Sequence, residues 1–212
     1  MLAGLILMVG SHNSMADVKR AKDIIKKVNE KYKKLKSLQA EFEQTYTWEL
    51  AGETQTVTGT IYLTESNKYR IETDEQLVIT DGKTVWSYTD IDNHVIIDML
   101  KNSQANQLPK EILLQYSKEF EPDFLKEELV EGDKTFLLDL KPKDEEGLII
   151  SMKVWIDAKT WFTRKIEQID LNDNKNTYLV RNIQEDPELD PKLFQFEMPE
   201  DAEIVDLREG NN

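Results

Sequence analysis

The chain has 212 residues, enough for one large or two small domains, and 39% of them are hydrophobic while 32% are charged. This composition, with 8 Gly, 6 Pro and no low-complexity run, excludes a disordered chain and a collagen-like fibre. The 27 basic and 41 acidic residues give a formal net charge of −14. An acidic surface repels phosphate backbones, so we expect no nucleic-acid partner.

The first sixteen residues have the pattern of a secretion signal. Residues 2–9 are apolar but too few to span a bilayer, and the small-x-small sequence Ser14-Met15-Ala16 precedes the charged Asp17. We predict a signal peptide over 1–16 and a single domain over 17–212, although no Lys or Arg precedes the apolar run and the true start could lie upstream. The chain has no Cys near residue 16 to carry a lipid anchor, so we expect a soluble mature protein.

A basic amphipathic helix follows. Apolar residues recur at spacings of three and four, which predicts one buried stripe: Ala21, Ile24, Ile25, Val28, Tyr32 and Leu35. Residues 17–36 contain nine basic and three acidic residues. Such a helix can lie on an anionic membrane, but the favoured interpretation is a solvated face of a helix that packs on an acidic body.

From residue 38 the hydrophobic period changes to two. Residues 38–50 alternate as one long half-buried strand, in which Gln44 alone puts a polar group on the apolar face; we expect it to bond a backbone group or a helix end. Further strands are predicted over 54–63, 69–73, 76–80, 84–88, 95–99, 125–130, 136–140, 148–156, 161–170, 178–183 and 204–205. Asp81-Gly82 marks a hairpin, and a short helix is predicted after Pro109. These elements allow a sandwich, a barrel or a half-barrel with helices on its concave side.

The chain offers little catalytic chemistry. With no Cys and with His94 as the one histidine outside the predicted signal, zinc sites and Cys/His nucleophiles are excluded. Residues 170–174 lack the Gly and Glu of a calcium loop and are interpreted as a turn. We therefore expect no enzyme activity, no metal and no cofactor. The strand aromatics pack the core or line an apolar cavity.

Several segments, in their order and spacing over residues 20–206, resemble the LolA-type outer-membrane lipoprotein carriers, which are periplasmic chaperones. These segments are Leu38-Gln39-Ala40-Glu41-Phe42-Glu43-Gln44, Gly59-Thr60-Ile61-Tyr62-Leu63, Tyr69-Arg70-Ile71-Glu72, residues 80–88, residues 193–199 and Ile204-Val205-Asp206. The resemblance implies a mainly β (α+β) fold with two or three helices, in which an unclosed, strongly curved antiparallel half-barrel carries a helical lid. It also implies a monomer in the periplasm that takes acylated lipoproteins from an inner-membrane releasing transporter to an outer-membrane acceptor.

The resemblance also assigns residues to the cargo site. The cavity wall is expected to include Leu38, Phe42, Tyr46, Ile61, Tyr69, Ile71, Ile79 and Trp86. The lid is expected to include Val28, Tyr32, Leu35, Pro109, Ile112 and Leu113. A register error of one residue would exchange wall and surface.

One departure concerns the latch of the lid. Where the family has an Arg followed by Pro, this chain has Glu65-Ser66, and a carboxylate cannot donate the hydrogen bonds of an Arg. Either Lys68 or Arg70 replaces that Arg, or the chain handles another cargo. The alternative function is a periplasmic lipid-binding or lipid-sensing regulatory module of the same fold.

Overall fold

The computed structural model describes residues 15–102, 120–143 and 147–208. Its elements are α1 (Met15–Lys34), β1 (Ser37–Trp48), β2 (Glu53–Thr64), β3 (Tyr69–Thr73), β4 (Gln76–Thr80), β5 (Thr84–Thr89), β6 (His94–Met99), β7 (Phe120–Val130), β8 (Asp133–Pro142), β9 (Ile149–Asp157), β10 (Thr163–Asp170), β11 (Lys175–Glu185), the 3-10 helix η2 (Pro191–Phe194) and β12 (Glu203–Asp206). The helix predicted after Pro109 falls outside the described residues.

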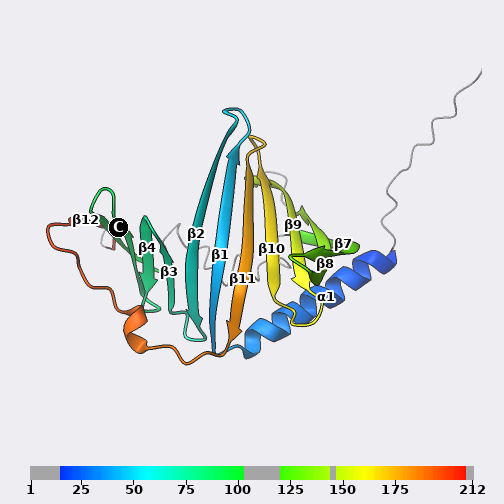
Figure 1. The fold of residues 1–212 in the computed structure, drawn as a ribbon, viewed down its shortest axis with the longest axis horizontal. Coiled ribbons are helices and arrows are strands. Elements are labelled where there is room, and N and C mark those ends of the chain that lie inside the picture. The colour runs from blue at the N-terminus through cyan, green and yellow to red at the C-terminus, as the bar shows by residue number, and fades with distance from the viewer. Residues whose placement is uncertain (1–14, 103–119, 144–146, 209–212) are drawn as a thin grey trace, which may run out of the picture.

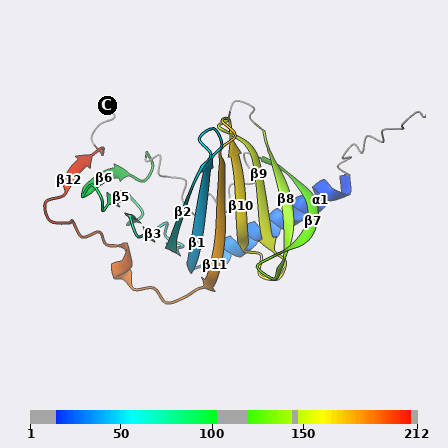
Figure 2. The ribbon, with the colours of Figure 1, turned by 45° about the horizontal axis from the view of Figure 1, so that its top comes forward.

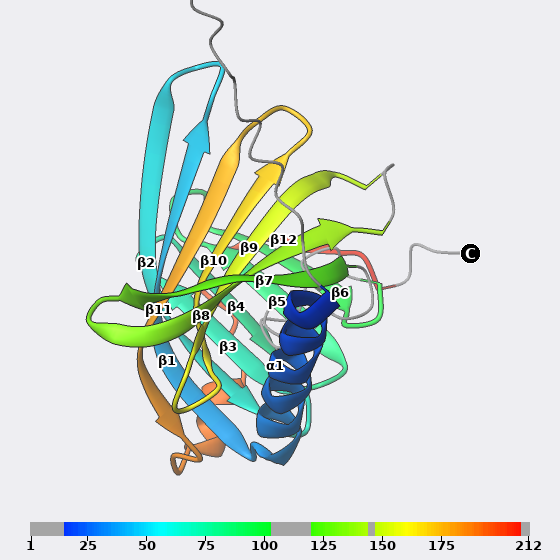
Figure 3. The same cartoon turned by 90° about the vertical axis from the view of Figure 1, so that its right-hand side faces the viewer.

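The strands form one 12-stranded sheet in the order β12-β6-β5-β4-β3-β2-β1-β11-β10-β9-β8-β7 (Figure 1). Neighbours are antiparallel except for the parallel pair β12–β6. Strands β12 and β7 are the two edges, so the sheet stays open, and it curves strongly (Figures 2 and 3). The predicted α+β half-barrel, with helix α1 over its concave side, is confirmed.

Helix α1 packs one face on the sheet and presents lysines to solvent. Its buried residues are Ala21, Ile24, Ile25, Val28 and Tyr32, which confirms the predicted stripe. Its basic groups meet acidic partners on the sheet: Arg20 lies 2.5 Å from Glu127 and Lys31 lies 2.5 Å from Glu185. Partly exposed ion pairs each contribute about 0–1 kcal/mol, so the apolar stripe supplies most of the stabilisation.

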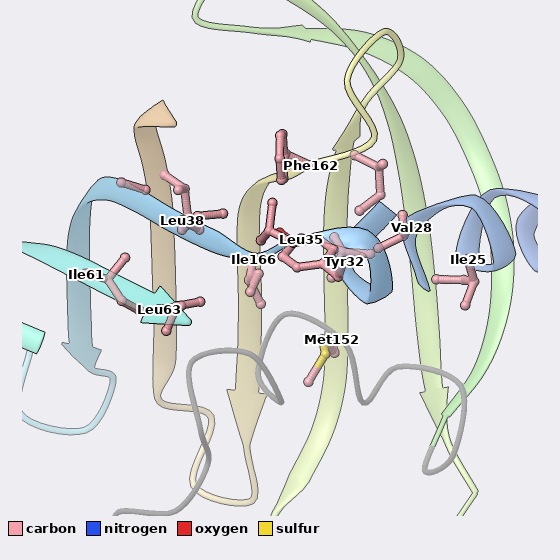
Figure 4. Close-up of a cluster of buried hydrophobic side chains, with 14 of the residues drawn as sticks. Ile25, Val28, Tyr32, Leu35, Leu38, Ile61, Leu63, Met152, Phe162 and Ile166 are labelled. Atoms are coloured by element: carbon pink, nitrogen blue, oxygen red, sulfur yellow. The ribbon is translucent and has the colours of Figure 1, made fainter. Parts of the chain in front are cut away.

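The core lies between α1 and the concave face. The Tyr32 ring meets Phe162 edge to face, with centroids 5.5 Å apart and planes at 87°. Figure 4 shows Val28, Tyr32 and Leu35 gathered with Phe162 and Ile166. All five side chains belong to one buried cluster, which also contains Ala21, Ile24 and Ile25, so the whole apolar stripe of the helix is embedded.

Three of the local predictions that differ from the structure concern turn geometry, an edge proline and a polar side chain. Strand β10 begins at Thr163 and not at 161, because Trp161 has a φ of 66° and belongs to the turn. Strand β7 begins at Phe120, five residues earlier than predicted, and contains Pro122, which an edge strand tolerates. Among the described residues Gln44 bonds neither backbone nor a helix end; its Nε2 donates to side chains of β11.

Gly59 makes room for an aromatic ring. It faces Phe42 across the β1–β2 pair, and a Cβ placed on Gly59 would lie 2.8 Å from Cζ of Phe42 and 2.3 Å from the carbonyl oxygen of Glu72. Any other residue at position 59 would therefore push against the β3 backbone and against the ring. The glycine thus allows Phe42 to lie across the concave surface of β2.

We expect Gly59→Ala to lower the free energy of unfolding by about 1–3 kcal/mol, because the added methyl overpacks the site. Urea denaturation measures this change. Thr58→Ala, one residue away on an exposed position, is the control and should cost less. Equal effects of the two substitutions would contradict the assigned role of Gly59.

Burial raises the pKa of Tyr32 to about 12, although a hydrogen bond from the Thr163 backbone opposes the shift. Because the folded state favours the protonated phenol, the associated stability is complete below about pH 10 and is lost as the pH rises from about 10 to 12. The loss amounts to about 3 kcal/mol at most. We expect Tyr32→Phe to flatten the fall of unfolding free energy in this window. An unchanged slope would contradict the shift.

Candidate ligand-binding cavity

A cavity of about 480 Å³ lies on the concave face, beside the C-terminal end of α1. This volume is in the usual range for small-molecule sites. Its walls come from α1, β1–β4, β10, β11 and the β3–β4 turn, through Tyr32, Leu38, Ala40, Phe42, Gln44, Gln55, Val57, Ile61, Ile71, Thr73, Glu75, Gln76, Val78, Ile166, Tyr178, Val180 and Ile183. Most of these side chains are apolar, so the cavity suits a hydrophobic ligand.

Strand register explains why these residues converge. Ala40, Ile61, Ile71 and Val78 lie opposite one another in the successive pairs β1–β2, β2–β3 and β3–β4. Because paired residues share a face, one row of small and branched side chains crosses four strands. Alternate residues along β1 then extend the apolar surface to Phe42.

The structure brings together five of the residues predicted for the cargo site. Leu38, Phe42, Ile61 and Ile71 line the cavity, and so does Tyr32, which was predicted for the lid. Figure 4 shows Tyr32 on the helix, with Leu38 on β1 and Ile61 on β2. Side chains of the helix and of two strands therefore meet at the apolar end of the cavity.

Other predicted residues lie nearby but do not line the cavity. Val28, Leu35 and Tyr69 are buried members of the adjoining core cluster. Tyr46 lies farther along β1, where its ring contacts Trp48 and its hydroxyl donates to Asp170 at 3.4 Å. The predicted lid residues Pro109, Ile112 and Leu113 fall outside the described residues.

Ile79 and Trp86 lie on the opposite face of the sheet, which corrects the assignment of both to the cavity wall. They pair with each other across β4–β5, one residue out of step with the Val78 row. Phe196 stacks on Trp86 there, with centroids 6.0 Å apart and planes at 5°. The C-terminal segment thus covers these apolar side chains. The alternation of residues along one strand does not predict such a cover.

This placement separates Trp86 from the ligand site. We expect Phe196→Ala to expose Trp86 and shift its fluorescence emission to the red, while the affinity of the cavity for an acyl fluorophore stays within twofold of wild type. Trp86→Phe serves as the control that assigns the emission change. A large loss of affinity in Phe196→Ala would contradict the two-face arrangement.

Several lining residues were not predicted. Val57, Val78, Val180, Ile166 and Ile183 are apolar and alternate along their strands, but the strand order needed to aim them at one cavity is a long-range property. Ile183 also follows Asn182, whose φ of 48° interrupts the regular alternation of β11. Hydrophobic periodicity could predict that most of these residues are buried, but not that they line a cavity.

One end of the cavity carries a polar network. Gln44 Nε2 donates to Asn176 Oδ1 at 3.1 Å and to the Tyr178 hydroxyl at 3.0 Å. Asn176 Nδ2 donates to the same hydroxyl at 3.0 Å. Burial raises the pKa of Tyr178, although these two donors oppose the shift, so the phenol is protonated at neutral pH.

The alternative latch at Arg70 is not seen in the described residues. Arg70 pairs with Ile79 on the outer face, and its Nε donates to Glu72 at 2.9 Å. It therefore points away from α1. Glu65 and Ser66 lie in the β2–β3 turn, where the Ser66 and Thr64 hydroxyls are 3.0 Å apart.

A larger hollow, of about 1090 Å³, has a different character. Its lining includes Arg164, Arg181, Glu131 and Asp133, and the Arg181 guanidinium bonds Glu131 at 2.6 Å and Glu43 at 3.0 Å. Charged side chains that already pair with each other gain little from an apolar ligand. The smaller cavity is therefore the better candidate for a hydrophobic ligand.

Within the described ranges, no group of three or more His, Cys, Asp or Glu side chains is placed to hold a metal ion. In the same part of the chain, no helix has the length and hydrophobicity needed to cross a membrane. The candidate site is thus a binding cavity built from apolar side chains with a polar end.

Comparison with known proteins supports this interpretation. Residues 33–197 match the family described as outer membrane lipoprotein carrier protein LolA. The chain is 29% identical over 172 residues to an outer-membrane lipoprotein carrier protein of Glaesserella parasuis, covering 80% of this chain and 78% of that protein. It is 27% identical over 188 residues to an uncharacterized protein of Methanocaldococcus jannaschii, covering 87% of this chain but spanning only about half (53%) of that protein.

Solved structures share the fold at low sequence identity. An uncharacterized conserved protein from Thermus thermophilus superposes with a TM-score of 0.61 at 13% identity, covering 88% of this chain and 99% of that one. The lipoprotein LppX of Mycobacterium tuberculosis superposes with a TM-score of 0.52 at 11% identity, covering 81% and 99%. Both likenesses concern the fold alone.

Proposed function

The chain belongs to the family of outer membrane lipoprotein carrier proteins, a family of carriers and not of enzymes, and we propose that it shields the acyl chains of lipoproteins in its 480 Å³ cavity. The observation that carries the proposal is the apolar concave row beside Tyr32, formed by Ala40, Ile61, Ile71 and Val78. Each CH₂ removed from water there is worth about 0.8 kcal/mol.

The transport route is part of the same proposal. The predicted signal over 1–16 and the match to carriers support a periplasmic monomer whose single domain occupies 17–212. Such a carrier takes acylated lipoproteins from a releasing transporter in the inner membrane and delivers them to an acceptor at the outer membrane. Delivery requires that the acceptor hold the acyl chains more tightly than this cavity does.

A charge inside the cavity tests the binding site. We expect Phe42→Glu to weaken the binding of an acyl fluorophore at least tenfold, because a buried carboxylate carries a large desolvation cost. Gln39→Glu is the matched control, since it adds the same charge three residues away on the other face of β1. Fluorescence titration measures both, and equal affinities of the two variants would remove the cavity assignment.

A second experiment separates carrier from lipid binder. The protein is loaded with an acylated lipoprotein and mixed with acceptor liposomes, and native mass spectrometry identifies what remains bound. If the protein binds the acylated lipoprotein and then releases it to the liposomes, the result supports the carrier function. Exclusive retention of free fatty acid or phospholipid would favour the alternative of a lipid-binding or lipid-sensing module.

A further inference from the structure

The polar end of the cavity has unused hydrogen-bonding capacity. The Tyr178 hydroxyl accepts two hydrogen bonds, one from Gln44 and one from Asn176, so both of its lone pairs are occupied. Its own proton has no acceptor among the residues that the structure describes. Because Tyr178 lines the cavity and is protonated at neutral pH, it can donate one hydrogen bond to a ligand.

Gln44 supplies the complementary group. Its Nε2 donates one hydrogen to Asn176 and the other to Tyr178, which fixes the orientation of the side-chain amide. In the described part of the chain, its Oε1 has no donor within hydrogen-bonding distance. Gln44 also lines the cavity, so a fixed acceptor lies beside the fixed donor of Tyr178.

We propose that Gln44 and Tyr178 form a headgroup subsite that binds the secondary amide of an N-acyl chain. The amide carbonyl accepts from the Tyr178 hydroxyl, and the amide N–H donates to Gln44 Oε1. The proposal rests on the proposed function and deepens it, because it states which linkage at the head of the acyl chain the cavity recognises.

Other headgroups fit less well. An ester has acceptors only, so a bound ester offers Gln44 Oε1 no hydrogen-bond donor. A fatty carboxylate also has no donor, and Glu75 lines the same cavity and opposes a second negative charge. The amide matches one donor and one acceptor without adding charge.

The subsite also orients the chain. Along β1 the lining changes from Leu38 and Ala40 at one end to Gln44 at the other, a span of about 20 Å at the rise of an extended strand. The Tyr32 ring closes the apolar end beside α1. An acyl chain with its amide at Gln44 therefore runs toward the helix, with its methyl end in the apolar core.

The test compares three probes of equal chain length, N-methyldodecanamide, methyl dodecanoate and dodecanoate, with dodecylpyrene as a probe that has no polar head. Calorimetry or displacement titration gives each affinity. For the wild-type protein we expect the amide to bind about fivefold tighter than the ester, the usual worth of one hydrogen bond. Dodecanoate should bind more weakly than either.

Two variants separate the two groups. Tyr178→Phe should lower the affinity for amide and ester alike by about fivefold, since both lose the donor to their carbonyl. Gln44→Met should abolish the preference for amide over ester. Both variants remove a polar group from the cavity lining, so neither should bind dodecylpyrene more weakly than the wild type does. Circular dichroism shows independently that both are folded.

The outcomes distinguish this inference from the function on which it rests. Equal affinities for the amide and the ester in the wild type, or a preference unchanged in Gln44→Met, would overturn the subsite and leave the acyl cavity standing. Tightest binding of dodecanoate would likewise overturn it. Failure of every probe, dodecylpyrene included, would overturn both proposals.

Discussion

The structure depends on the width of the concave face of the sheet, which is greater than the single described helix can cover. Helix α1 packs on this face through its apolar stripe, in which the ring of Tyr32 meets that of Phe162 with centroids 5.5 Å apart. Beyond that contact the apolar face continues across β1–β4 without a helical cover among the described residues. The cavity is thus a part of the core that the described residues leave unfilled, and it is this space that we propose a hydrophobic ligand fills.

On the opposite face of the sheet, the C-terminal segment of the chain covers the apolar surface. Trp86 and Ile79 would form an apolar patch there, but the residues after β11 return over them, with Phe196 stacked on Trp86. Both faces of β4 therefore carry apolar side chains, and among the described residues the cavity lies on the concave one. This arrangement explains why aromatic content alone does not identify the cavity.

Much of the fold follows from local pattern. The helical stripe, the long alternation that became β1, and the Asp81-Gly82 hairpin were all predictable because periodicity and turn chemistry act over a few residues. Those patterns did not distinguish a sandwich from a half-barrel. The family resemblance supplied the curvature of the sheet and the helical lid. The start of β7 at Phe120, ahead of the predicted residue 125, brings Pro122 into the strand, which an edge strand tolerates.

The site was less predictable than the fold. Leu38, Phe42, Ile61 and Ile71, which were predicted for the cargo site, line the cavity, whereas Ile79 and Trp86 lie on the opposite face, since a step of one residue exchanges the faces. Tyr178 was predicted as part of the strand over 178–183 but not as part of the cavity, because its partner Gln44 is 134 residues away in sequence. Only the register between β1 and β11 places the two side chains together.

The C-terminal segment has a mechanical consequence for the curved sheet. It leaves β11 near the middle of the sheet, where Asp186 accepts hydrogen bonds from the backbone of Lys36 and Ser37, and it ends as β12, paired in parallel with β6 at the edge. The segment is therefore a tether fastened at two points of one half of the sheet (Figure 1). Because the segment crosses the face opposite the cavity, where Phe196 stacks on Trp86, its path lengthens when that half of the sheet curls more tightly. The tether must then stretch or detach, so it limits how far that half of the sheet can close over the concave side.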